Sequence, residues 1–317
     1  MEKEKGKQEF NHRSVLLDEC MEGLAIKPDG IYVDGTAGGA GHSSEIAKKL
    51  ESGRLVAIDQ DETAVAVATE RLNALGKNTT VVRSNFSEVG KVCRELGIER
   101  IDGLLLDLGV SSYQLDTAER GFSYSADAPL DMRMDNRCSL SAYEVVNTYS
   151  EQELKKILFD YGEERFAPAI ASAIVRKREV APIRTTAELS DIIKYAMPPS
   201  AREGGHHPAK RSFQAIRIEV NRELDVIEPA IRSAVELLAP GGRIAIITFH
   251  SLEDRIVKQA FASLASGCTC PKDFPVCVCG NKPKVKLVNR KPILPSKQEL
   301  EENPRSRSAK LRVAEKL

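Results

Sequence analysis

The 317-residue sequence lacks a net charge, a long apolar run and an apolar leader segment. Its 46 Lys and Arg balance its 46 Asp and Glu, so the chain as a whole is no basic surface for nucleic acid, and any such surface must be local. No apolar run approaches the roughly 18 residues that a membrane span needs. The charged N-terminal stretch MEKEKGKQEFNHRS precedes no apolar segment, which argues against a signal peptide and predicts a cytoplasmic protein.

Two common phosphate-binding fingerprints are also missing from the glycine-rich stretch YVDGTAGGAGHSSEI, residues 32–46. It does not contain G-x-G-x-x-G, and His42 stands where a Walker loop would have its lysine. What is present is a short apolar strand, a glycine-rich turn and a helix that Ser43 or Ser44 can cap. Such a turn lets the backbone approach a ligand, and the helix N-terminus offers amide donors. The alternative is an ordinary tight turn.

Strand and helix patterns alternate in the first third of the chain, which predicts a parallel sheet built from βαβ units. After about Tyr113 the strand pattern stops for about 100 residues and only helical patterns follow, at 141–162, 166–179 and 185–197. A long helical pattern then covers 213–238, and the segment 239–242 predicts a turn. The predicted strands are 30–35, 54–59, 79–86, 101–109, 243–251, 284–291 and 308–316. We therefore expect domain boundaries at 1–112, 113–215 and 216–317, with the middle segment a helical insertion.

Four residues follow or end successive predicted strands: Asp34, Asp59, Phe86 and Asp107. Ligands of parallel sheets lie at the carboxyl ends of the strands. Asp59 is placed to accept both hydroxyls of an adenosine ribose, which fits nicotinamide cofactors and S-adenosylmethionine alike, and Phe86 could stack on the adenine. A surface carboxylate and a core phenylalanine are the ordinary alternatives at these two positions.

Four of the seven cysteines lie together in CTCPKDFPVCVC, at Cys268, Cys270, Cys277 and Cys279. In a reducing compartment such a cluster suggests a metal before a disulfide, and four thiolates could bind one zinc ion. The C-x-C spacing is tighter than the common C-x-x-C, and reduced loop thiols are the alternative.

Long stretches of the sequence resemble the bacterial small-subunit ribosomal RNA cytosine methyltransferase family of the MraW or RsmH type. These stretches include HRSVLLDECMEGLAIKPDGIYVDGTAGGAGHS, DGLLLDLGVSSYQLDTAERGFSYSADAPLDMRMD, HPAKRSFQAIRIEVN and APGGRIAIITFHSLEDRIVK. The resemblance covers His12 to Lys316. It implies an α/β fold, a class I (Rossmann-like) S-adenosylmethionine-dependent methyltransferase sheet with an inserted α-helical domain. It also implies methylation of the exocyclic amine (N4) of a cytidine in the decoding centre.

The resemblance also implies a set of cofactor contacts. These are Ala40, Gly41, His42, Asp59, Phe86, Asp107 and Gln114.

A cytosine amine is a poor nucleophile, because its lone pair is conjugated into the ring, and an acceptor for its proton would help it. Many amino-methyltransferases use an Asp/Asn-Pro-Pro-aromatic motif here, whereas this chain has DLGVSS. We therefore expect Asp107, Ser111, Ser112 or a carbonyl between them to accept the proton. The alternative is that Asp107 only fixes the loop or the cofactor. His250 is a candidate for orienting the substrate, or else a structural histidine at a strand end.

Basic residues gather in two segments, which predicts contacts with RNA phosphates, although a solvated helix face is the alternative. The expected contacts are His206, His207, Lys210, Arg211, Arg217 and Arg222 around Phe213, and Arg305, Arg307, Lys310 and Arg312 near the C-terminus. The implied partner is small-subunit ribosomal RNA within the 30S subunit. A homodimer stays open.

Three other functions predict different features: an NAD-dependent oxidoreductase, a non-catalytic RNA-binding protein and a DNA amino-methyltransferase. The missing dinucleotide fingerprint argues against the oxidoreductase. The intact glycine loop argues against the non-catalytic RNA-binding protein, and the missing Pro-Pro motif argues against the DNA amino-methyltransferase.

Overall fold

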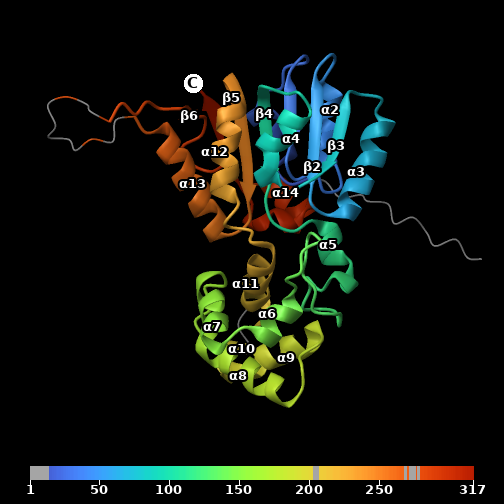
Figure 1. Ribbon diagram of the computed structural model, residues 1–317, viewed down its shortest axis with the longest axis vertical. Helices are drawn as coiled ribbons and strands as arrows, with labels where there is room; N and C mark the ends of the chain where they lie inside the picture. The colour runs from blue at the N-terminus through green and yellow to red at the C-terminus, as the bar shows by residue number, and fades with distance from the viewer. Residues whose placement is uncertain (1–13, 203–206, 268–269, 271–275, 277–278) are drawn as a thin grey trace, which may run out of the picture. The chain divides into compact units, whose positions relative to one another are not determined.

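The computed structural model describes residues 14–202, 207–267, 270, 276 and 279–317. The chain divides into two units (Figure 1). The first combines residues up to Leu108 with residues from Ile227, and the second is Gly109–Val226. The second unit is therefore longer at both ends than the expected 113–215. At its C-terminal end the reason is the helix α11 (Lys210–Asn221), which packs on helices of the second unit and buries Phe213 and Ile216 in their core.

One sheet organises the first unit, with strand order β3-β2-β1-β4-β5-β7-β6 in the described residues. The strands are β1 (Ile31–Asp34), β2 (Arg54–Asp59), β3 (Thr79–Arg83), β4 (Ile101–Asp107), β5 (Leu238–Thr248), β6 (Val285–Leu287) and β7 (Lys310–Lys316). The first five are parallel, and β7 is antiparallel to both β5 and β6. The predicted parallel sheet and both late strands are confirmed.

Helices cover both faces of this sheet (Figure 1). They are α1 (Leu17–Leu24), α2 (Gly41–Lys49), α3 (Glu62–Ala74), α4 (Val89–Glu95), α12 (Ile227–Leu237), α13 (Ser251–Ala265) and α14 (Lys297–Glu302), with short 3₁₀ turns η1 (Phe86–Glu88) and η3 (Pro304–Ser308). α1 contacts α2 and the central strands, while α12 packs on α4 and α13. The strands β1, β2, β4 and β5 are mostly buried between these layers, which explains their apolar runs, whereas β3 is half-buried and β6 is mostly exposed.

The segment 239–242, expected to be a turn, is instead part of β5. The pairing with β4 passes from Ile101 opposite Leu238 to Gly103 opposite Arg243, so extra residues of β5 are accommodated in an irregularity. Gly241 has a φ of 80° there, a conformation that glycine adopts without strain. The Pro and Gly residues of this segment, which predicted a turn, instead form a bulge within the strand.

The regular secondary structure in the described residues of the second unit is helical, apart from one isolated bridge between Pro129 and Thr185. Its helices are α5 (Ser112–Asp116), α6 (Ala142–Thr148), α7 (Glu151–Asp160), α8 (Ala167–Val180), α9 (Thr186–Ala196), α10 (Pro199–Arg202) and α11, with the 3₁₀ turn η2 (Ala118–Arg120). Their apolar faces form a separate core.

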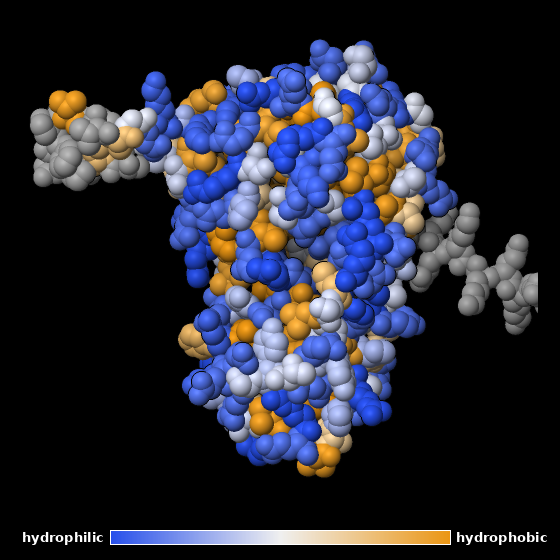
Figure 2. Space-filling model, in the orientation of Figure 1, coloured by the Kyte–Doolittle hydropathy of each residue, from blue (hydrophilic) through white to orange (hydrophobic). Residues whose placement is uncertain are grey.

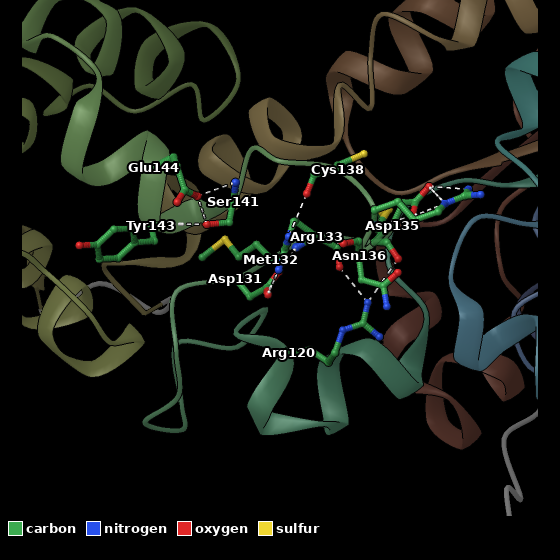
Figure 3. Close-up of polar contacts among 12 residues, drawn as sticks. Arg120, Asp131, Met132, Arg133, Asp135, Asn136, Cys138, Ser141, Tyr143 and Glu144 are labelled. Carbon is green, nitrogen blue, oxygen red and sulfur yellow. Dashed lines mark hydrogen bonds and ion pairs between the residues drawn. The ribbon is translucent and has the colours of Figure 1, made fainter.

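Polar contacts shape the loop that leads into α6 (Figure 3). Arg133 forms an ion pair with Asp131 at 2.8 Å and donates to the carbonyl of Cys138. Arg120 donates to the carbonyl of Arg133 at 2.8 Å. Ser141 and Glu144 then form a capping box at the start of α6. The loop is thus held by side chains on its own residues and on η2.

Two long helical patterns are each broken into two helices. Residues 141–162 break before α7, because Ser150 caps that helix in a capping box with Glu153. Residues 213–238 break after α11, where Arg222 is left-handed with a φ of 51°. Beside the break, the Asn221 amide accepts from the Met134 N–H at 2.7 Å and donates to the Met132 carbonyl. The second break therefore depends on contacts with a distant loop.

No helix in the described part of the chain is long and apolar enough to cross a membrane. The face shown in Figure 2 mixes polar residues with scattered apolar ones.

Candidate cofactor site of the first unit

The three predicted carboxylates do end neighbouring strands of the sheet. Asp34 ends β1, Asp59 ends β2 and Asp107 ends β4, while Phe86 begins η1 shortly after β3. Because these strands are parallel neighbours in the order β3-β2-β1-β4, their carboxyl ends meet at one edge. The predicted placement of these residues at one edge of the sheet is confirmed, and their binding roles stay predictions.

Asp34 organises the start of the glycine loop. It is 1% exposed, accepts from the Ser43 hydroxyl at 2.6 Å and from the Thr36 N–H at 3.1 Å. The Thr36 hydroxyl in turn accepts from the N–H of Asp107 at 2.6 Å. This chain of bonds links the ends of β1 and β4. Asp34 therefore acts as an internal brace, and its oxygens are occupied by protein donors.

Asp59 has a different environment, because both of its oxygens accept from backbone. The N–H of Gly38 donates to Oδ2 at 2.8 Å and that of Asp61 donates to Oδ1 at 2.9 Å. Gly38 has a φ of 49°, which helps the loop to present this N–H. Burial raises the pKa of Asp59 to about 6, although both bonds favour the charged form. Each oxygen has acceptor capacity left for a hydroxyl.

Phe86 and Gly35 form the neighbouring wall of the site. A Cβ on Gly35 would lie 2.5 Å from the Leu106 side chain and 3.0 Å from Cβ of Phe86, so only glycine fits this position without rearrangement. Phe86 is partly exposed rather than part of the core. A partly exposed aromatic at this edge of the sheet suits a flat, polar-edged ligand such as a nucleoside.

Ala40, Gly41 and His42 form the junction of the glycine loop with α2. Ala40 is left-handed with a φ of 60° and Gly41 is the first helical residue. The His42 ring is 5% exposed, and its Nε2 lies 2.9 Å from the carbonyl oxygen of Val15. Its Nδ1 lies 3.7 Å from Oδ2 of Asp107. Both ring nitrogens therefore face protein groups, and any contact of His42 with a ligand would come from its backbone.

Asp107 combines burial with an unused oxygen. Its side chain is 26% exposed, yet Oδ1 is buried and has no hydrogen-bond partner among the described residues. Burial raises the pKa of Asp107 to about 6, and the nearby His42 opposes this rise. An unsatisfied buried acceptor is costly and suggests a ligand that donates to it.

Ser111, Ser112 and Gln114 belong to the second unit, at the start of α5. Ser111 caps this helix, accepting from the Gln114 N–H at 3.2 Å, while the Gln114 side-chain oxygen accepts from the Ser111 N–H at 3.0 Å. Ser112 is the first residue of the helix and is partly buried. The catalytic and cofactor roles of these three residues stay predictions.

His250 is the N-cap of α13. Its Nδ1 lies 3.5 Å from the N–H of Glu253, and its Nε2 lies 3.1 Å from the Glu253 carboxylate. Glu253 is 1% exposed and also accepts from the N–H of Phe249. This arrangement gives His250 a clear structural role at a helix start.

The basic residues expected to contact RNA divide into two groups. Arg217 pairs with Glu223 at 2.8 Å, and Arg312, which is 8% exposed, pairs with Asp254 at 2.7 Å. Lys310 is half-buried and lies 3.5 Å from the same Asp254 carboxylate. Phe213 is 3% exposed and belongs to the core, so it offers no stacking surface. The exposed members are His207, Lys210, Arg211, Arg222, Arg305 and Arg307. His206 lies outside the described residues.

The zinc prediction stays a prediction, because Cys268 and Cys277 lie outside the described residues. Cys270 and Cys279 are described, and no group of three or more metal-ligating side chains occurs among the residues the structure covers.

Contacts from both ends of the chain complete the site, and sequence reasoning missed them. Val15 contacts His42, while the N–H of Leu16 donates to the buried Glu299 carboxylate at 2.7 Å. Leu16 and Glu299 are 283 positions apart, so no local sequence pattern could predict their contact.

The sheet order with β7 between β5 and β6, the glycine loop after β1 and the acid ending β2 define a class I, Rossmann-like S-adenosylmethionine-dependent methyltransferase. Comparison with known proteins then fixes the family: the chain belongs to the MraW methylase family, which matches residues 9–317.

Several relatives and solved structures are similar to the chain. Ribosomal RNA small subunit methyltransferase H 2 of Agathobacter rectalis is 61% identical over 310 residues, covering 97% of this chain and 99% of the relative. Ribosomal RNA small subunit methyltransferase H of Clostridioides difficile is 60% identical over 310 residues, covering 98% and 100%. A solved rRNA methylase from Streptococcus thermophilus aligns with a TM-score of 0.43 at 13% identity, covering 94% of this chain and 95% of its own.

Proposed function

We propose that this protein transfers a methyl group from S-adenosylmethionine to the exocyclic N4 amine of a cytidine in the decoding centre of small-subunit ribosomal RNA. The observation that supports it most is the family match over residues 9–317, together with 60% identity to relatives named small subunit methyltransferase H. The cytidine and its amine come from the resemblance described above and are the finer part of the proposal.

The residues at the strand ends fit the cofactor. Asp59 would accept the ribose hydroxyls with the capacity that its two backbone bonds leave, and Phe86 would lie beside the adenine. The loop residues Ala40, Gly41 and His42 would approach the ligand through their backbone. Asp107 would offer its unsatisfied Oδ1. Gln114 completes the proposed set.

When bound, the cofactor supplies an electrophilic methyl group on a sulfonium. The protein must align the cytidine amine with the methyl carbon and sulfur, because the transfer is an in-line displacement and positioning provides much of its rate. The amine must also lose a proton. We propose Asp107 as its acceptor, with Ser111, Ser112 or a carbonyl between them as alternatives.

The target base must leave its stack to reach such a pocket. We propose that the helical unit and the C-terminal segment bind the RNA through exposed basic residues, and that the substrate is presented within the 30S subunit. From Asn281 to Leu317 the chain has eleven Lys and Arg against four Glu, a local excess of seven positive charges. A homodimer stays open and would be tested by light scattering.

The proposal is tested by incubating the protein with labelled S-adenosylmethionine and either 30S subunits, protein-free small-subunit RNA or DNA, and identifying the modified nucleoside. We expect N4-methylcytidine in ribosomal RNA and none in DNA. Labelling of a different nucleoside would overturn the choice of cytidine N4, and no transfer to any RNA would overturn the enzyme assignment. Asp107→Asn separates two roles: loss of turnover with unchanged cofactor affinity supports proton acceptance, whereas full turnover excludes it.

A further inference from the structure

A short N-terminal strap, Ser14–Leu16, fixes the His42 ring in one tautomer. A carbonyl oxygen can only accept, so the 2.9 Å contact with Val15 requires a proton on Nε2. The strap cannot easily shift, because Glu299 accepts from the Leu16 N–H. At its other end the Ser14 hydroxyl occupies the space where a Cβ on Gly41 would lie, 2.0 Å away.

With Nε2 protonated, the other ring nitrogen faces Asp107. If His42 were neutral and Asp107 ionised, a lone pair on Nδ1 would face a carboxylate oxygen 3.7 Å away, which is unfavourable. One proton between the two groups removes this conflict, either as an imidazolium beside a carboxylate or as an imidazole beside a carboxylic acid. The geometry therefore favours a pair that holds one proton.

The surroundings of the pair are acidic. Asp34 from β1, Glu253 from α13 and Cys20 from α1 interact electrostatically with Asp107. Asp34 and Glu253 oppose ionisation of Asp107, and His42 favours it. Burial raises the pKa of Asp107 to about 6.

We propose that His42 is a positioning residue whose Nδ1 holds the proton of this pair and thereby keeps Asp107 ionised, ready to accept a hydrogen bond from an amine of a bound ligand. The inference rests on the proposed function, which gives the site two such amines: the ammonium of the cofactor and the exocyclic amine of the target base. The unsatisfied Oδ1 of Asp107 is the acceptor in either case.

The variant His42→Gln tests the pairing. A Gln amide can still donate to the Val15 carbonyl but places no ionisable nitrogen beside Asp107. Asp107 should then ionise at higher pH. Affinity for S-adenosylhomocysteine, measured by calorimetry from pH 5 to 8.5 on the full chain, should fall about tenfold per pH unit below the apparent pKa. We expect this fall to begin at least about half a pH unit higher in the variant, with affinity recovered at pH 8.5. Lys48→Gln, an exposed change on the same helix, should leave the profile unchanged.

A second profile distinguishes the two amines. The rate of methyl transfer at saturating cofactor reports the target base, whereas S-adenosylhomocysteine binding without RNA reports the ammonium. A shift in either profile supports the inference. Equal loss at every pH in both would show that His42 only supports the loop and would overturn it. Failure of folded wild-type protein to bind the nucleoside at any pH would overturn the proposed function itself.

Nitrogen NMR of the histidine rings gives a reading that does not depend on the variant's stability. The protein has five histidines, so the resonance of His42 must be assigned. If the His42→Gln variant folds, the resonance missing from its spectrum is that of His42. If it does not fold, a paramagnetic ligand bound at the site identifies His42 by its faster relaxation. We expect Nε2 to carry a proton at every pH, because it faces the Val15 carbonyl. A ring with its single proton on Nδ1 would overturn the inference.

Discussion

Replacing Asp107 with Asn should stabilise the free protein while impairing the site. Burial raises the pKa of this carboxyl to about 6, whereas in an unfolded chain it is about 3.9. Folding at pH 8 therefore imposes a cost of up to about 3 kcal/mol on the charged form. The side chain is 26% exposed, so solvent screening reduces the cost, and we expect a gain of about 1–3 kcal/mol in the variant. An Asn amide can also donate to Nδ1 of His42.

The pH dependence gives this prediction its sign. The folded-state pKa lies above the unfolded one, so the penalty is fully present above pH 6, shrinks as pH falls and disappears below about pH 4. Thermal unfolding should therefore show a Tm gain of about 2–6 °C for Asp107→Asn at pH 8, reduced to roughly half at pH 5. A Tm gain that is constant with pH, or a Tm loss at pH 8, would refute the assignment of the buried charge.

Asp254→Asn is the matched control. Its carboxylate is also well buried but pairs with Arg312 at 2.7 Å, and this guanidinium lowers the pKa of Asp254. Here the folded-state pKa lies below the unfolded one, so stability is present at neutral pH and is lost as pH falls. The same chemical change should therefore destabilise the protein at pH 8. Opposite signs for the two variants would show that the environment of each carboxylate, and not the substitution itself, decides the result.

Three further outcomes follow from the site and the charge distribution. Glu299→Ala removes the acceptor for the Leu16 N–H and should weaken S-adenosylhomocysteine binding about 5–20-fold by calorimetry. Glu299→Gln keeps an acceptor oxygen, so its affinity should stay within about threefold of wild type. Equal effects of the two variants would refute the strap's role. Raising salt from about 50 to 200 mM should reduce RNA affinity at least tenfold in a filter-binding assay, and a flat dependence would remove the phosphate contacts. Metal analysis of protein purified without chelator should find about one zinc per chain if the four cysteines bind it, and less than a few tenths would reject that site.

The strand-end residues could be predicted from the sequence because they follow from topology alone. Once the strands alternate with single helices, a parallel sheet is required, and the last residue of each strand must lie at the same edge. Asp34, Asp59 and Asp107 were therefore placed correctly without any knowledge of side-chain contacts. Their individual environments could not be predicted in this way. That Asp34 is an internal brace, whereas Asp107 has an unused oxygen, depends on donors such as Ser43 and Thr36 that only the folded loop defines.

The two broken helices show a similar contrast. The break before α7 can be predicted locally, because Ser150 and Glu153 have the spacing of a capping box. The break at Arg222 has no such local signal. It depends on Asn221, whose amide contacts Met132 and Met134, 89 and 87 positions earlier in the chain. A helical periodicity continues through the break, so the sequence pattern alone favours one long helix.

Charge is where the sequence misled most. A cluster of basic residues predicts a phosphate-binding surface only if the charges are not already neutralised. Arg217 and Arg312 form ion pairs with Glu223 and Asp254. The sequence pattern does not show that these carboxylates pair with the two arginines in the fold. The same reasoning applies at the cofactor site in reverse. His42 stands where a Walker loop would have its lysine, yet in the fold its Nε2 faces the Val15 carbonyl and its Nδ1 faces Asp107. No local motif connects these residues. The loop sequence determines that a ligand can approach, and the long-range contacts determine the charge that it meets.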